Sequence, residues 1–271
     1  MDDRVSFRLY EDTMPHCLEI AALQKGLVLV LDGKELIEEG VGFGLPVVKY
    51  EDKTYFSSAA QTRLHTDSDP PTLVKTFLFD TISRKRLGKD SYINDHFYAF
   101  FHGLFEKAYL VRNEMAPAFN LIMELRKALK VHTDFVRAPF RGKVKVAYTC
   151  FPNLLRVRVD FSELHKEGCQ EILVLNEQGS TFFTKYSDSD GLLTFGGRIG
   201  PWQKVTAERA SLSDRRDTLS FTLENVRSAG LFRGYERTRG RFSWAGLGYS
   251  LPKTICSFDY GISLKVKAAN E

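Results

Sequence analysis

Alternation of apolar and polar residues with period two is the feature that most limits what this chain can fold into. It is clearest over Leu155 to Phe161 and recurs over Lys143 to Thr149. Successive side chains of a strand point to opposite faces of a sheet, so the pattern predicts strands with one buried and one solvated face. The candidate strands recur at intervals of roughly eight to twelve residues, which is typical of an antiparallel sandwich or barrel.

Turn signals separate these strands. Asp32-Gly33 lies between the strand-like runs Leu27 to Leu31 and Lys34 to Ile37. An Asp-Gly pair favours a type I′ hairpin because both central residues need a positive φ. Further turns are expected at Glu51 to Lys53, Glu177 to Gly179, Ser187 to Gly191 and Ser213 to Asp217.

The period changes to a helical one near the middle of the chain. Aromatic and aliphatic residues recur at helical spacing from Phe97 to Ala108, and a second apolar stripe runs from about Glu114 to Leu129. We therefore predict a mainly β fold, an antiparallel multi-strand sandwich with a two-helix insertion near residues 94–130. No linker or repeat divides the sequence, so residues 1–271 are expected to form a single β-rich domain. The galactose-mutarotase-like supersandwich is the fold with which we would compare it.

Bulk composition is that of an ordinary globular protein, with 43% hydrophobic and 27% charged residues. The formal net charge of +4 permits nucleic-acid binding without arguing for it. The opening segment MDDRVSFRLY lacks the apolar core of a signal peptide. No run approaches the ~20 apolar residues that span a bilayer. These features predict a cytoplasmic protein with no membrane contact.

The common spacing-dependent chemistries are absent from the sequence. Cys17, Cys150, Cys169 and Cys256 form no CxxC pair, and the six histidines form no HxH or HExxH pair. The run Gly40 to Leu45 fails the dinucleotide-binding spacing, and there is neither a GxSxG elbow nor a Walker lysine. We therefore predict no metal and no cofactor, and the sequence leaves open whether the protein is an enzyme.

Carbohydrate binding or modification in a cleft of the sandwich is the function that we favour from the sequence. Sugars rest their apolar ring faces on Trp or Tyr, while charged and polar side chains bind their hydroxyls. If chemistry occurs, a His with a Glu or Asp would be the natural acid–base pair. The candidate ligand-binding residues are Arg63, His65, Trp202, Tyr235, Arg241 and Trp244.

Two alternatives remain open at this stage. Residues 233–244 combine four arginines with three aromatics, a pattern that could bind nucleic acid or another anionic surface. In the second alternative the chain is a non-catalytic scaffold whose helical pair contacts a partner protein. The sequence does not indicate the oligomeric state.

Overall fold

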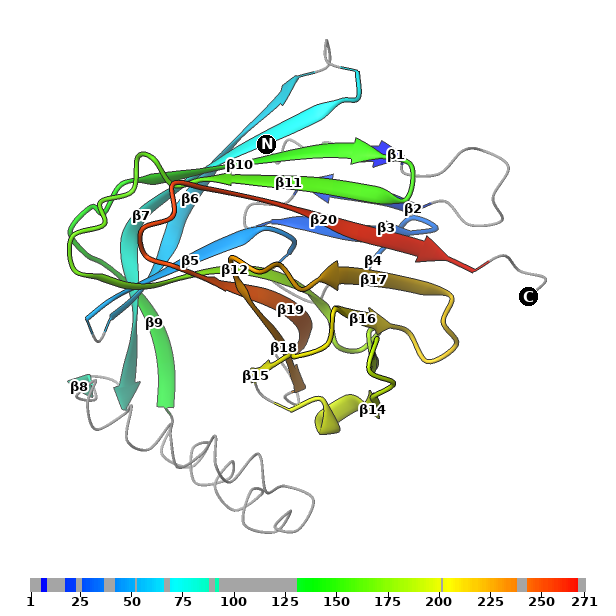
Figure 1. Cartoon of the computed structure of the whole chain (residues 1–271). Coiled ribbons are helices and arrows are strands. Elements are labelled where there is room, and N and C mark those ends of the chain that lie inside the picture. The colour runs from blue at the N-terminus through cyan, green and yellow to red at the C-terminus, as the bar shows by residue number, and fades with distance from the viewer. Residues whose placement is uncertain are drawn as a thin grey trace.

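A computed structural model of the protein describes residues 6–8, 18–22, 26–36, 42–51, 53–65, 69–87, 91–92, 131–200, 202–237 and 243–267. These residues lie almost entirely in antiparallel strands (Figure 1). A small sheet has the order β1-β2-β3-β4, made of Ser6–Arg8, Leu18–Ala22, Leu27–Leu31 and Lys34–Glu35. The remaining strands belong to one large sheet.

The large sheet follows the order β14-β13-β16-β17-β20-β11-β10-β7-β6-β5-β12-β19-β18-β15. Its first seven strands are Leu193–Phe195, Lys185–Asp188, Arg209–Ser213, Leu219–Glu224, Ser257–Val266, Leu154–Asp160 and Lys143–Phe151. The other seven, from β7 to β15, are Thr72–Leu87, Lys53–His65, Leu45–Tyr50, Cys169–Gly179, Ser243–Leu251, Gly230–Arg237 and Gln203–Lys204. Two more strands, β8 (Ser91–Tyr92) and β9 (Val131–Arg137), pair with the far half of β7.

This sheet folds over on itself, so that its two halves form the layers of a sandwich. Two tyrosines cross the interior: Tyr260 of β20 donates a hydrogen bond to Asn176 Oδ1 of β12 over 2.8 Å, and Tyr148 of β10 donates to the Phe43 carbonyl over 2.9 Å. The inward residues of β10 and β11 are buried and their alternate residues are more exposed. The mainly β, antiparallel sandwich predicted from the period-two pattern is confirmed.

The two ends of the strand order are neighbours along the chain. β14 ends at Phe195, a short 3₁₀ turn η1 covers Gly196–Arg198, and β15 begins at Gln203. The chain therefore passes directly from one layer's edge to the other layer's edge. This crossing places Trp202, immediately before β15, against the outer face of β18 and β19, meaning the face turned away from the opposite layer.

Polar side chains of β12 fix the small sheet to the sandwich. Gln178 is fully buried; its Oε1 accepts from the Leu29 amide over 3.1 Å, and its Nε2 donates to the Leu27 carbonyl over 3.2 Å. Two positions earlier, Asn176 Oδ1 accepts from the Gly44 amide over 2.9 Å. Because these amides supply the partners that a neighbouring strand would otherwise provide, β3 can be buried without orphaned backbone groups.

The turn predictions fare differently. Asp32 and Gly33 both have positive φ, 50° and 77°, which confirms the hairpin between β3 and β4. The hairpin between β5 and β6 lies at Glu51 as expected. The turn predicted at Glu177 to Gly179 is wrong, because β12 continues to Gly179 and pairs with Trp244. These polar residues are typical of a turn in sequence, but in the fold their backbone pairs with Gly42, Leu36 and Trp244.

The predicted helices cannot be matched to the structure. No α-helix occurs in the part of the chain that the structure describes, and the two-helix insertion expected near 94–130 lies outside the described residues, so it is not borne out. Among the same residues, no helix has the length and apolarity that a membrane crossing requires.

The buried amide of Gln178 provides a test of how β3 is held. Replacing it in Gln178→Leu leaves the Leu29 amide buried without this acceptor, while the Leu27 carbonyl keeps the Phe43 amide as its donor, so the change should cost about 1–3 kcal/mol of unfolding free energy. Urea unfolding measures the loss. Gln170→Leu, at an exposed position of the same strand, is the matched control and should change stability by less than about 0.5 kcal/mol. Equal effects of the two substitutions would contradict this role.

Lys75 of β7 gives the fold a pH dependence. The residue is fully buried, with Nζ 3.4 Å from the Gly26 carbonyl oxygen, and burial lowers its pKa from 10.5 to about 8. Between these values the unfolded chain holds the proton that the folded chain has lost, so stability should rise with pH, by at most about 1.4 kcal/mol per pH unit. Urea unfolding from pH 7 to 9.5 should show this slope in the native protein and in the exposed-site control Lys143→Met. The slope should be missing in Lys75→Met.

Candidate functional site

Strand pairing brings a row of glycines together on the outer face of the β12-β19-β18 layer. Gly234 of β18 lies opposite Gly246 of β19, and Gly246 lies opposite Glu177 of β12. Gly248 follows Gly246 by two residues, so it points to the same face. We call Gly234, Gly246 and Gly248 the glycine floor.

Each position of the glycine floor is occupied from above by a larger group. A Cβ at Gly234 would lie 2.8 Å from Trp244 Cη2 and 2.9 Å from Trp202 Cδ2. At Gly246 it would lie 2.7 Å from Glu177 Cγ. Glycine is needed here because other groups approach the backbone closely, since none of the three has a positive φ.

Two tryptophans stand side by side on this floor. The rings of Trp202 and Trp244 are stacked, with centroids 4.8 Å apart and planes inclined by 19°. Trp244 is only 7% exposed, whereas Trp202 is 37% exposed. Trp244 therefore braces a ring that solvent can reach. We call the surface formed by Trp202, Trp244, Glu177 and the glycine floor the tryptophan face.

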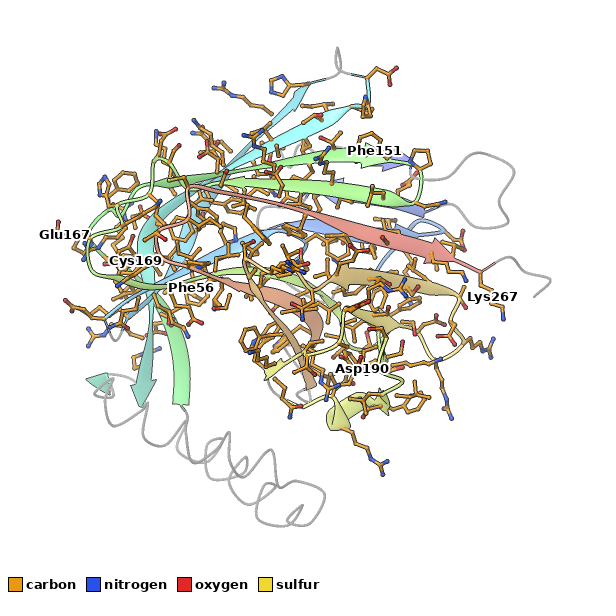
Figure 2. All side chains as sticks on the ribbon, viewed as in Figure 1. Phe56, Phe151, Glu167, Cys169, Asp190 and Lys267 are labelled. Carbon is orange, nitrogen blue, oxygen red and sulfur yellow. The ribbon has the colours of Figure 1, made fainter. Side chains whose placement is uncertain are left out.

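Contacts on the inner side of the same strands hold the segment after Trp202 in place. Arg233 donates from Nη2 to Gln203 Oε1 over 3.2 Å, and its guanidinium lies 4.2 Å from the centroid of the Tyr186 ring. The Tyr186 hydroxyl donates to Asp188 Oδ2 over 2.9 Å, and burial raises the pKa of this phenol above its usual value. Figure 2 labels Asp190, at the turn that follows this strand. These contacts make the position of Trp202 depend on both layers.

Glu177 is the acidic residue of the tryptophan face. Its Cγ packs over Gly246, and only 4% of the residue is exposed. A carboxylate accepts several hydrogen bonds, which suits it to hydroxyl groups that enter beside an aromatic ring. Farther along the same face, Lys49 pairs with Glu171 over 2.6 Å, and Ser250 donates from Oγ to Glu171 over 3.1 Å.

A cleft of about 630 Å³ opens beside the tryptophan face. We call it the basic cleft, because among the described residues that line it two side chains are cationic and none is acidic. The polar residues that line it are Lys204, Thr206, Asn225, Arg227, Ser228 and Ser250.

The structure brings together two of the six residues predicted to bind ligand. Trp202 and Trp244 are stacked. Tyr235 is nearby in sequence but points to the inner face, where its hydroxyl donates to the Ser180 carbonyl over 3.2 Å. Arg63 and His65 are exposed on the β6–β7 hairpin, which extends away from β18 (Figure 1). Arg241 lies outside the described residues.

The proposed arginine segment can be followed only in part. Of residues 233–244, those from 238 to 242 lie outside the described residues. Arg233 contacts Tyr186 and Gln203 within the protein, so its guanidinium is engaged on the inner face. The structure therefore gives no arrangement of Arg237, Arg239 and Arg241 on a common surface.

Sequence reasoning missed Glu177, Lys204 and the glycine floor. The run Ala245-Gly246-Leu247-Gly248 places glycines at alternate positions of a strand, a signal of close approach on one face. Nothing comparable marks Glu177, whose role depends on the pairing of β12 with β19. Within the described ranges, no group of three or more His, Cys, Asp or Glu side chains could hold a metal ion.

Comparisons with known proteins complete the description. No family model matches the chain, and no curated protein matches it either. Among solved structures, Slr1438 from Synechocystis sp. PCC 6803 is 10% identical, with a TM-score of 0.41, over 98% of this chain and 97% of its own. A candidate aldose 1-epimerase from Escherichia coli K12 is 8% identical, with a TM-score of 0.38, over 98% and 99%. HI1317 is 9% identical, with a TM-score of 0.31, over 96% and 100%. Such distant likeness assigns no ligand and no site residue.

The glycine floor makes a prediction about the tryptophan stack. In Gly234→Ala the new Cβ would collide with both indoles, which should cost about 1–3 kcal/mol of stability. The separation of the rings should change the near-ultraviolet circular dichroism of the protein. Gly261→Ala, in β20, is the matched control because its Cβ would meet only the tip of Leu154, at 3.0 Å. An unchanged tryptophan spectrum in Gly234→Ala would contradict the close packing described here.

Proposed function

We propose that this protein binds a carbohydrate on the tryptophan face. The observation that carries the proposal is the 37% exposed ring of Trp202, held in place by Trp244 and the glycine floor. Ligand sites use partly exposed aromatic rings of this kind, held by a neighbouring ring and by the strands beneath, as platforms.

The chemistry of the face suits a sugar ring. A pyranose presents C–H groups on one face, which pack on an indole, and hydroxyls around its edge, which need hydrogen-bond partners. Glu177 packs over Gly246 on this face, and Ser250 and Lys49 lie farther along it. A single flat ring with polar groups at its border gives orientation as well as affinity.

Tryptophan fluorescence is a site-specific probe in this protein. The chain contains only two tryptophans, and both belong to the tryptophan face. Binding of a sugar there should therefore shift or quench nearly all of the tryptophan emission. A glycan array identifies ligands, and titration of each hit against the emission gives its Kd.

Substitution of the exposed ring tests the proposal. Trp202→Ala should weaken sugar binding at least tenfold, since about 1.4 kcal/mol of stacking free energy corresponds to that factor. Isothermal calorimetry measures the variant, which has lost part of the fluorescence signal. Phe140→Ala removes an aromatic of similar exposure, 48%, near His165 rather than the tryptophan face, and should leave the Kd unchanged.

Two results would contradict carbohydrate binding. One is an array without a hit whose binding depends on Trp202. The other is tight binding of an oligonucleotide that weakens steeply with salt and is unaffected by Trp202→Ala, which would favour the nucleic-acid alternative.

A further inference from the structure

The basic cleft is continuous with the tryptophan face. Lys204 pairs with Phe232 in register, and Gln203 pairs with Arg233, so the residue before them, Trp202, stands over Gly234. Trp202, immediately before β15, and Lys204 thus lie on one edge of the same face, two residues apart. Gly230 and Ser250, which line the cleft, lie opposite each other on β18 and β19.

Phe232 forms the boundary between the two regions. A Cβ at Gly230 would lie 3.1 Å from Cε2 of the Phe232 ring, so this ring leans from the tryptophan face toward the cleft. Phe232 also lies opposite Gly248, part of the glycine floor. A ligand that stacks on Trp202 therefore has a direct path over one aromatic ring into the cleft.

The charges of the cleft are unbalanced. Lys204 and Arg227 are both exposed, and among the described residues no carboxylate pairs with either of them. Thr206 and Ser228 add hydroxyl donors, and Asn225 donates from Nδ2 to the Val205 and Ala207 carbonyls, over 3.3 and 3.2 Å. This leaves its side-chain oxygen as the main acceptor beside several donors. Such a cleft favours an anion over a neutral group.

We infer that the ligand is an anionic saccharide, with its ring on the tryptophan face and its carboxylate, phosphate or sulfate in the basic cleft beside Lys204 and Arg227. The inference rests on the proposed function and names the class of sugar. Lys204 follows Trp202 by two residues and lines the cleft, so a charged group carried at the edge of a ring stacked on Trp202 would lie toward the cleft.

The test compares four compounds by tryptophan fluorescence: glucose, glucuronate, glucose 6-phosphate and inorganic phosphate. The native protein should bind at least one anionic sugar about tenfold or more tightly than glucose, as expected for hydrogen bonds to a charged group. This preference should shrink as salt is raised, because both cations are exposed to solvent. Comparison of glucuronate with glucose 6-phosphate distinguishes a carboxylate from a phosphate.

Substitutions of the two cations test whether the preference for anionic sugars arises in the basic cleft. The double variant Lys204→Gln/Arg227→Gln should bind the anionic sugar as weakly as the native protein binds glucose, with the affinity for glucose unchanged. Lys253→Gln, at an exposed lysine of a separate cleft lined by Lys166 and Thr254, is the control and should keep the full preference.

The outcomes separate this inference from the proposed function. If neutral and anionic sugars bind equally, or if the preference survives in the double variant, the anionic class is wrong while carbohydrate binding stands. If inorganic phosphate binds as tightly as glucose 6-phosphate, the cleft is an anion site unconnected with the sugar, and the inference also fails. If no sugar binds, both proposals fail together.

Discussion

β12 is the element on which the rest of the structure depends, because its inner face contacts the small sheet and the opposite layer, while its outer face forms part of the tryptophan face. On the inner face, Gln178 satisfies backbone groups of the small sheet, and Asn176 accepts from the Gly44 amide and from the hydroxyl of Tyr260 in the opposite layer. On the outer face, Glu177 borders the tryptophan stack. A slip of one residue in its pairing would exchange these faces, turning Glu177 inward and the two amides outward.

The buried side-chain amide of Gln178 restricts where the small sheet can pack. Leucine in place of Gln178 would leave the buried Leu29 amide without the Gln178 acceptor, and the Leu27 carbonyl would keep only the Phe43 amide as a donor. Gln178 therefore selects one placement of the small sheet. The same requirement fixes the segment around Phe43 and Gly44, which accepts from Tyr148 and donates to Asn176.

The tryptophan face follows from this register. Gly234 and Gly246 can face each other only when β18 and β19 pair as they do, and only then is there room for two indoles above them. Trp202 reaches this face because the chain crosses from β14 in the opposite layer to β15. The proposed ligand platform is thus assembled from segments whose relative position is set by the closure of the sandwich.

The sequence by itself determined the strands, because the alternation with period two is a pattern of neighbouring residues, such as Leu155 to Asp160. It also determined the Asp32-Gly33 hairpin, because that turn depends only on local residues. It also singled out Trp202 and Trp244. Only the tertiary structure decided that these two rings stack, that Tyr235 turns inward, and that Arg63 and His65 lie on a distant hairpin. Glu177 to Gly179 were mistaken for a turn for the same reason. Their partners, Leu36, Gly42 and Trp244, are far away in sequence, and strand pairing between distant segments leaves no signature in local composition.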